Sequence, residues 1–399
     1  LSPYAVSGVA ACNAANRISH FFDLLGPSLA VDTACSSAMT AIHQACEALR
    51  SGRSSLALAG GANVLLNPVG YMGFSHASML SPTGRCRPFS QQADGYVRAE
   101  AVGVLLLKPL KAALVDGDRI HGVILGSAAN ADGRTLGLSF PSARSQAALL
   151  SGVYAAAGLT PGDVAYVEAH GTGTVAGDPV ECRALGRALG QGRNQPLPVG
   201  SVKSNLGHAE SASGIPGLLK GLLVLREQWI PPTLHAAPVN PAINFPLLGL
   251  SPAVEGQPLP SAGRSVVGVN SFGFGGANVH VILASAPAPC ANGTPAPAGR
   301  PRAHLSTPAP RTRTRVPLVI SARTPQALAE AAHAWAAHFE DQTGRPDARQ
   351  AFYNAAYTAC RRRAWHPHRA AILASGPQSA AAALRSVAAG KPEGAALVQ

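Results

Sequence analysis

Charged and aromatic side chains are scarce in this sequence of 399 residues: Asp, Glu, Lys and Arg together make up 13% and Phe, Trp and Tyr 5%. No segment interleaves basic with aromatic residues, which argues against a nucleic-acid-binding module. No uninterrupted run of 18 apolar residues occurs, so no membrane-spanning helix is predicted. Hydrophobic residues still make up 47% of the chain, which is ample for a buried core.

Closely spaced cysteine pairs are also missing. The seven cysteines are odd in number and scattered without a Cys-x-x-Cys pair: Cys12, Cys35, Cys46, Cys86, Cys182, Cys290 and Cys360. This pattern argues against a disulfide scaffold and against a zinc site, and it is typical of a reducing compartment. We therefore expect a cytoplasmic protein without a bound metal.

The net charge of +12 is unevenly distributed. Residues 1–285 contain 18 basic and 15 acidic side chains, whereas residues 286–399 contain 14 basic and 5 acidic ones. A basic segment of this kind would attract an acidic partner protein. A solvated basic surface without a partner is an equally good explanation.

Cys35 lies at the start of a predicted helix, in the run Val31-Asp32-Thr33-Ala34-Cys35-Ser36-Ser37-Ala38. Apolar residues spaced three and four apart predict this helix over residues 36–50, and a strand is predicted over residues 28–33. Unpaired backbone N–H groups and the helix dipole at a helix N-terminus favour a thiolate. The alternative is a small buried cysteine without a chemical role.

Two histidines follow short apolar strands, and each lies close to a glycine. The first is in Glu168-Ala169-His170-Gly171-Thr172-Gly173-Thr174, and the second is in Lys203-Ser204-Asn205-Leu206-Gly207-His208-Ala209-Glu210. Active sites of open α/β sheets assemble at the carboxyl ends of strands. One cysteine and two histidines at such ends predict a nucleophile with acid–base or electrophilic partners, although a lone histidine near glycine is more often structural.

A glycine-rich turn between two predicted strands forms the fourth segment, Asn270-Ser271-Phe272-Gly273-Phe274-Gly275-Gly276-Ala277-Asn278. Its backbone N–H groups could face a developing oxyanion.

Together and in this order, the four segments resemble the β-ketoacyl synthase (ketosynthase) domain of a type I polyketide synthase. The shared motifs are Asp-Thr-Ala-Cys-Ser-Ser, Glu-Ala-His-Gly-Thr-Gly-Thr, Lys-Ser-Asn-x-Gly-His and Gly-Phe-Gly-Gly-x-Asn. The resemblance covers residues 1–285, and residues 316–399 resemble the small linker between a ketosynthase and an acyltransferase. It implies a thiolase-like layered α/β/α fold that lacks its N-terminal part, followed by a small α/β linker domain.

The resemblance also implies the catalytic roles. Cys35 would accept the growing acyl chain as a thioester, and His170 and His208 would promote decarboxylation of a malonyl-type extender. The backbone N–H groups of Cys35 and Phe274 would form an oxyanion hole, with Gly275 and Gly276 contacting the substrate. The activity would be that of a 3-oxoacyl-[acyl-carrier-protein] synthase, an acyltransferase.

Supporting roles and partners follow from the same resemblance. Lys203 would orient Glu210 and His208 by charge pairing, and Thr172 and Thr174 would hydrogen-bond a phosphopantetheine arm. The domain would bind no cofactor of its own, since its substrates arrive on an acyl carrier protein. Further expected partners are an acyltransferase domain of the same polypeptide and a second copy in a homodimer.

Acyl transfer and decarboxylation require these residue types, whatever the family. A thiolate is both a good nucleophile and a good leaving group, so acyl exchange between thioesters costs little free energy. Decarboxylation builds negative charge on a thioester oxygen, which neutral imidazole N–H groups stabilise in a dry pocket. The rival hypotheses are a fatty acid synthase, an inactive docking fragment and a papain-type hydrolase, the last disfavoured by the two histidines and the Lys-Ser-Asn context.

The chain is expected to be a fragment. Only 34 residues precede Cys35, whereas each βαβ unit needs about 30 residues or more. More than one such unit of the family's fold is therefore expected to be missing upstream.

Three parts are predicted along the chain: a partial ketosynthase domain over residues 1–285, a Pro/Ala/Arg-rich connector over 286–315 and a linker domain over 316–399. Further strands are predicted near 55–60, 120–128, 164–169, 197–202, 265–270, 278–284, 316–320 and 368–374. Further helices are predicted near 143–157, 179–190, 212–227, 326–339, 350–361 and 378–389.

Other polar residues are interpreted as structural. Asp94 and Glu100 could form a paired-carboxylate site, but a turn cap and a salt-bridged strand are the preferred interpretation. Six histidines have no partner pattern and are also expected to be structural: His20, His43, His76, His121, His235 and His280.

Overall fold

The computed structural model describes residues 4–260, 265–287, 315–345, 347–361, 363, 365–391 and 396–398. The chain divides into two compact units, Leu1–Gly299 and Arg300–Gln399. Most of the predicted connector, residues 288–314, lies outside the described residues. Within the described residues, no helix is both long and apolar enough to cross a membrane.

A six-stranded sheet forms the centre of the first unit. Its order is β3 (Val123–Ala131), β10 (Ala277–Ala284), β9 (Val266–Phe272), β4 (Val164–Glu168), β5 (Leu197–Gly200) and β7 (Leu250–Pro252). Strands β9, β4, β5 and β7 are parallel, and β10 is antiparallel to both β3 and β9. Strands β4, β5 and β9 are buried along their whole length, because helices cover both faces of a largely parallel sheet.

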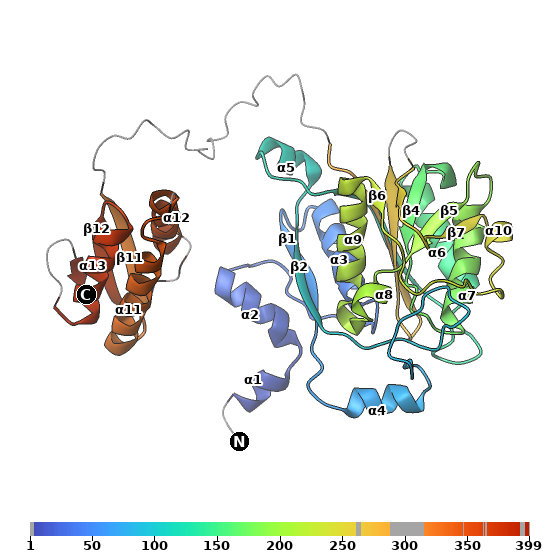
Figure 1. Ribbon diagram of the computed structural model, residues 1–399, viewed down its shortest axis with the longest axis horizontal. Helices are drawn as coiled ribbons and strands as arrows, with labels where there is room; N and C mark the ends of the chain where they lie inside the picture. The colour runs from blue at the N-terminus through green and yellow to red at the C-terminus, as the bar shows by residue number, and fades with distance from the viewer. Residues whose placement is uncertain are drawn as a thin grey trace. The chain divides into compact units, whose positions relative to one another are not determined.

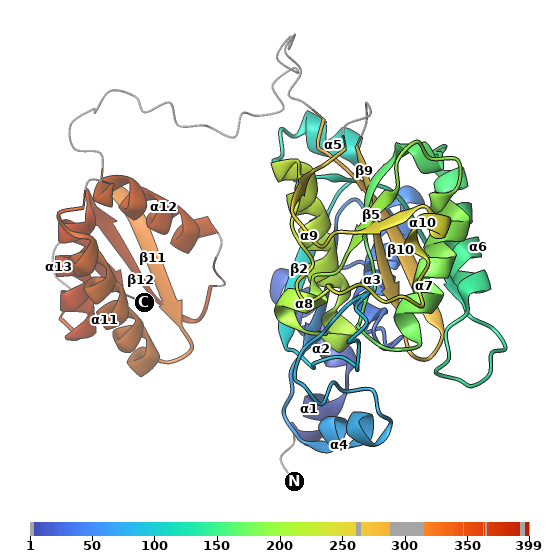
Figure 2. The same ribbon diagram turned by 45° about the vertical axis from the view of Figure 1, so that its right-hand side comes forward.

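Helices cover the sheet in layers (Figures 1 and 2). Helices α6 (Ala143–Ala156) and α7 (Gly177–Leu185) lie on one face, and α3 (Ser37–Arg50) and α9 (Gly214–Glu227) lie on the other. Beyond α3 and α9 lies an antiparallel pair, β1 (Ala57–Asn63) and β2 (Ala101–Leu107). Each layer buries its apolar residues against the next, so one core lies on each face of the sheet.

Shorter elements complete the described part of the first unit: α1 (Ala5–Val9), α2 (Cys12–Phe22), α4 (Val69–His76), α5 (Leu110–Val115), η1 (Pro161–Asp163), η2 (Gly186–Gly190), α8 (Lys203–Leu206), η3 (Glu210–Ala212), β6 (Trp229–Ile230), α10 (Phe245–Leu248) and β8 (Gln257–Pro258).

The predicted strand over residues 28–33 is wrong. Within the described residues this segment pairs with no neighbouring strand, and Leu29 is exposed. Its end folds into a turn instead, in which Ala34 N–H donates to Asp32 Oδ1 and Thr33 N–H donates to Ser37 Oγ, both at 2.9 Å. A strand needs a partner for its backbone groups, whereas a turn satisfies them locally.

The other strands and helices predicted for the first unit are present with shifted ends. The predicted helix over 179–190 is the most altered, because the α-helix ends at Leu185 and a π-helical turn, η2, follows. Strands β2, β6, β7 and β8 were not predicted, nor were helices α1, α2, α4, α5, α8 and α10 or the short helices η1 and η3.

The second unit is a small α/β domain with its own core. Strands β11 (Val316–Ala322), β12 (His368–Ala374) and β13 (Ala396–Val398) form an antiparallel sheet, with helices α11 (Pro325–Gln342), α12 (Ala348–Arg361) and α13 (Pro377–Ala388). Phe339 and Phe352 meet at the centre of the core with ring centroids 5.5 Å apart. Its elements match the predicted ones, except that β13 was not predicted.

Candidate active site

Cys35 lies just before Ser36, the N-cap residue of α3, and is buried. Its carbonyl oxygen accepts hydrogen bonds from Ser213 Oγ at 2.9 Å and Ser271 Oγ at 2.8 Å. Ser213 is the N-cap of α9 and Ser271 belongs to β9. The backbone of Cys35 is therefore held by α9 and β9, two elements that are distant from it in sequence.

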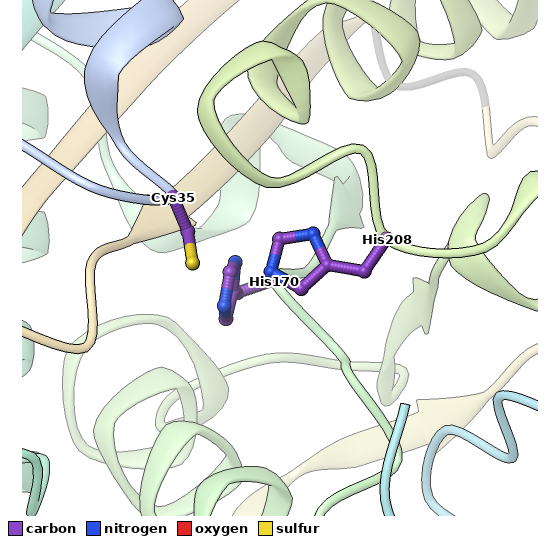
Figure 3. A group of neighbouring side chains, drawn as sticks. All are labelled: Cys35, His170 and His208. Carbon is purple, nitrogen blue, oxygen red and sulfur yellow. The ribbon is translucent and has the colours of Figure 1, made fainter. Parts of the chain in front are cut away.

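The structure brings Cys35, His170 and His208 together (Figure 3). The Cys35 sulfur and one ring nitrogen of each histidine lie within 4.8 Å of one another. His170 follows β4, and His208 lies between α8 and η3. The two imidazole rings meet edge to face, with centroids 5.4 Å apart.

Backbone N–H groups determine which ring nitrogen of each histidine carries the proton. Phe272 N–H donates to His170 Nδ1 at 3.4 Å, and Glu210 N–H donates to His208 Nδ1 at 3.1 Å. An imidazole nitrogen accepts only when it carries no proton, so the proton of each neutral ring is on Nε2. Burial, and then the Lys203 charge, hold the pKa of both histidines well below the usual value, so both rings are neutral.

The same hydrogen bonds disfavour a metal ion at this cluster. A histidine that binds a metal through Nε2 carries its proton on Nδ1 and donates that N–H to an acceptor. Here Nδ1 of His170 and of His208 each faces a backbone donor. The arrangement is suited to N–H donation toward a substrate.

Cys35 is a thiol in this environment. Burial raises the pKa of Cys35 to about 11, although a hydrogen bond from the Phe274 backbone and the Lys203 charge lower it. The expectation that the helix N-terminus would favour a thiolate is therefore wrong for the resting site. Removing a thiolate from water costs more than the nearby N–H groups and the positive charge offset.

The turn between β9 and β10 places the Phe274 backbone beside the sulfur. A side chain at Gly273 would collide with the Thr33 carbonyl, so only glycine permits this close approach. Gly276 has a φ of 87° and donates its N–H to the Gly273 carbonyl at 2.8 Å. Gly276 therefore shapes the turn, and its N–H group is already hydrogen-bonded to Gly273. Gly275 is exposed.

The expected pairing of Lys203 with Glu210 is wrong. Glu210 pairs instead with Arg98, whose Nη2 lies 2.8 Å from Glu210 Oε2 and whose Nε contacts Oε1. The reason is the backbone: His208 N–H donates to the Val97 carbonyl at 2.7 Å, and Ala99 N–H donates to the His208 carbonyl at 2.9 Å. These bonds hold residue 98 alongside the segment that carries Glu210.

Lys203 is buried and forms no ion pair among the described residues. Burial lowers its pKa, whereas the charges of Glu168 and Glu181 raise it. Its positive charge also lowers the pKa of Cys35, His170 and His208. Lys203 thus acts on the whole cluster rather than on one carboxylate.

Thr172 and Thr174 lie on the loop that follows His170. Their hydroxyl oxygens are 3.0 Å apart, and Gly177 N–H donates to Thr174 Oγ1 at 3.2 Å. Thr172 is buried and Thr174 is half-buried.

Sequence reasoning missed two carboxylates that hold this loop. Glu181 accepts the N–H groups of His170 at 2.7 Å and Gly171 at 2.8 Å. Asp178 accepts the N–H groups of Gly173 at 3.1 Å and Phe89 at 2.8 Å, and burial raises its pKa to about 7. A signal was present, because two acidic residues three apart at the start of a helix follow a glycine loop directly.

A third missed carboxylate, Glu168, lies at the end of β4. It accepts Val202 N–H at 2.5 Å and the Tyr166 hydroxyl at 2.7 Å, and it pairs with Lys220 at 2.8 Å. Glu168 thereby joins β4, α9 and the segment that leads to Lys203.

Asp94 and Glu100 do not form a paired site. Asp94 Oδ2 accepts the Thr83 hydroxyl at 2.6 Å and lies 3.4 Å from Arg87 Nη1, whereas Glu100 accepts Leu65 N–H at 2.7 Å. Each carboxylate holds a separate loop, which agrees with the structural interpretation.

Family models match three consecutive parts of the chain. Residues 1–113 match the β-ketoacyl synthase N-terminal domain, residues 121–237 match the β-ketoacyl synthase C-terminal domain, and residues 240–373 match the ketoacyl-synthetase C-terminal extension.

Curated relatives are much longer than this chain. Polyketide synthase ThaG of Burkholderia thailandensis is 51% identical over 286 residues, which are 70% of this chain and 5% of the relative. Polyketide synthase GfsA of Streptomyces halstedii is 43% identical over 397 residues, which are 98% of this chain and 5% of the relative.

Solved structures agree with these matches. The oxazolomycin ketosynthase domain OzmH KS7 of Streptomyces albus JA3453 has a TM-score of 0.69 at 36% identity, over 99% of this chain and 67% of that one. The ketosynthase from module 6 of the bacillaene synthase of Bacillus subtilis 168 has a TM-score of 0.70 at 33% identity, over 100% of this chain and 67% of that one. The fold is thus the thiolase-like α/β fold, and the chain belongs to the β-ketoacyl synthase family as a ketosynthase of the polyketide synthase type.

Proposed function

We propose that this domain extends an acyl chain held on Cys35 by decarboxylative Claisen condensation with a malonyl-type unit carried on an acyl carrier protein. The observation that carries the proposal is the convergence of one buried thiol with two neutral imidazoles within 4.8 Å. Each imidazole offers an Nε2–H donor, because a backbone N–H occupies its Nδ1.

In the first step, the Cys35 sulfur attacks the carbonyl carbon of an acyl-pantetheine thioester. The new S–C bond forms as the pantetheine S–C bond breaks, and the Cys35 proton leaves with the pantetheine thiol. The backbone N–H groups of Cys35 and Phe274, which both lower the pKa of the Cys35 thiol in the resting site, would stabilise the intermediate oxyanion.

In the second step, the malonyl unit loses its carboxylate as CO₂. The electron pair of the broken C–C bond passes into an enolate whose oxygen accepts the Nε2–H groups of His170 and His208. Neutral donors suit this task, since they stabilise the developing charge without first giving up a proton.

In the third step, the enolate carbon attacks the Cys35 thioester. A C–C bond forms, the Cys35 S–C bond breaks, and the sulfur leaves as a thiolate that regains a proton from solvent. The buried positive charge of Lys203, which lowers the pKa of Cys35, stabilises the leaving thiolate.

Several partners belong to this proposal. Thr172 and Thr174 would receive the phosphopantetheine arm, and the basic surplus of residues 286–399 would attract an acidic carrier protein. An acyltransferase domain of the same polypeptide and a homodimer remain predictions, as do a cytoplasmic location and the independence from a bound cofactor. The relatives described above are named polyketide synthases, which favours a polyketide over a fatty acid product.

Intact-protein mass after incubation with an acyl-pantetheine thioester tests the first step. We expect an acyl mass increment on the wild type and on the Cys12→Ser control, whose cysteine is exposed. The increment should be absent from Cys35→Ser. A folded protein without an increment, or with one that persists in Cys35→Ser, would point to a docking role instead.

Release of CO₂ from a malonyl-pantetheine thioester tests the second step. His170→Ala and His208→Ala should each lose about 10²-fold or more of the rate, the effect of removing one oxyanion donor. Both variants should still acylate Cys35, and His20→Ala should behave as the wild type, because His20 is an exposed residue of α2. Unchanged release in His170→Ala would contradict the assignment.

A further inference from the structure

A row of buried polar side chains connects α6 with the loop that carries His170. It consists of Tyr154 on α6, His280 on β10, Asn270 on β9 and Glu181 on α7, and none is more than 4% exposed. The distances are 3.1 Å from Tyr154 Oη to His280 Nε2, 2.6 Å from His280 Nδ1 to Asn270 Oδ1, and 2.8 Å from Asn270 Nδ2 to Glu181 Oε1. This row contains His280, which the sequence alone marked as structural.

The hydrogen-bond partners along the row assign each of its protons to one atom. The Glu181 carboxylate accepts three N–H groups, so the group that Asn270 turns toward it is the NH₂ of its amide. Asn270 Oδ1 then faces His280, whose Nδ1 must donate. Burial lowers the pKa of His280 to about 3, so the ring is neutral and its Nε2 accepts from the Tyr154 hydroxyl.

The row ends at the backbone of His170, which binds Glu181. Glu181 Oε1 accepts both the Asn270 amide and His170 N–H, and Oε2 accepts Gly171 N–H. Two residues along β9 from Asn270, Phe272 donates its N–H to His170 Nδ1. Strand β9 therefore holds the backbone of His170 through Asn270 and Glu181, and holds its ring through Phe272.

We propose that His280 and Asn270 are positioning residues for His170, with His280 selecting the one orientation of the Asn270 amide that binds Glu181. A flipped amide would place Oδ1 against Glu181 Oε1, and two acceptors repel. The His280 Nδ1–H prevents this flip, because only the correct orientation presents an oxygen to it. This inference rests on the proposed function, in which His170 donates to the enolate oxygen.

The test compares decarboxylation of malonyl-pantetheine with acylation of Cys35 in the full chain. We expect His280→Leu to lower CO₂ release about tenfold, equivalent to roughly 1.4 kcal/mol, while acylation of Cys35 changes less than about twofold. His280→Asn should restore most of the release, because its amide NH₂ can donate to Asn270 from the place of Nδ1. Tyr154→Phe should stay close to the wild type, since His280 still donates to Asn270.

Two controls separate positioning from stability. Val281→Ala removes buried methyl groups from the next residue of β10, so it lowers the melting temperature without touching the row. Nitrogen NMR of labelled histidine gives a readout independent of activity. In the wild type we expect His280 to be protonated on Nδ1 and His170 on Nε2. In His280→Leu the His170 signals should be shifted.

The outcomes distinguish the two proposals. Unchanged release in His280→Leu beside lost release in His170→Ala would overturn the positioning role alone. An equal loss in Val281→Ala, or an equal loss of acylation in His280→Leu, would also overturn it, because either would indicate general destabilisation. Release that does not depend on His170 would overturn the proposed function first.

Discussion

Burial sets the protonation state of each residue at the centre of the site. It raises the pKa of Cys35 and lowers that of His170 and His208, so the resting cluster holds a thiol and two neutral imidazoles. Lys203 is the cation whose charge acts on all three. A site of this kind stabilises negative charge on a substrate, because its N–H groups are already oriented and no anion of its own competes for them.

The reactivity of Cys35 should rise with pH over an unusually wide range. The thiolate is the reactive form, and below a pKa of about 11 its fraction increases about tenfold for each pH unit. Alkylation by iodoacetamide, followed on the Cys35 peptide by mass spectrometry, should therefore still accelerate above about pH 9, where a free cysteine derivative with a pKa near 8.5 levels off. Lys203→Met should slow the reaction at neutral pH, since it removes a charge that favours the thiolate. A plateau below about pH 9 would contradict this prediction.

At the scale of elements, two carboxylates in the N-terminal half of α7 shape the loop around His170. Glu181 and Asp178 accept four backbone N–H groups, three of them from residues 170–173. Gly171 and Gly173 have φ angles of 38° and 77°, which few other residues adopt. The loop therefore depends on helix carboxylates and on glycine together.

Asp178 should make the protein less stable as the pH rises toward neutrality. Its carboxyl ionises at about 7 in the folded protein and near 3.9 in an unfolded chain. Between these values the folded state binds a proton that the unfolded state has lost, so the free energy of unfolding falls as the pH rises. The always neutral Asp178→Asn should flatten this slope by up to about 1.4 kcal/mol per pH unit.

Urea unfolding at about pH 5, 6 and 7 measures this effect. Glu227→Gln is the matched control, because Glu227 is an exposed carboxylate at the end of α9. Parallel slopes for the wild type and Asp178→Asn would show that Asp178 does not titrate in this range.

At the scale of the whole molecule, the chain consists of two units with separate cores. In the first unit, one core lies between the sheet and the helices on each of its two faces. The core of the second unit contains only residues between 318 and 387. Each unit thus buries its own apolar residues, as an independently folding domain does.

Residues 315–399 should fold without the rest of the chain. Their core is closed by α11, α12 and α13 against β11 and β12. Expressed alone, this segment should show helical circular dichroism and a single cooperative urea transition. Phe352→Ala should lower its stability by about 3–5 kcal/mol, because Phe352 is fully buried. A gradual transition without a midpoint would mean that the second unit needs the first.

Local patterns along the chain were enough to predict most elements and the three central residues. Apolar spacing placed α3, α6 and α9, because the period of a helix is a local property. The motifs around Cys35, His170 and His208 were recognisable because each reactive side chain and its neighbouring turn residues lie in one short consecutive run of the sequence. The strand expected before Cys35 failed for the converse reason: a strand exists only with a neighbour.

The protonation of these residues and the contacts that hold them depend on the tertiary fold instead. The Arg98–Glu210 pair joins residues 112 apart, and the contact between His280 and Tyr154 joins residues 126 apart. The pKa of Cys35 is set by burial under several elements rather than by the helix that follows it. Desolvation and partner choice depend on which segments meet in space, and a local sequence pattern does not contain that information.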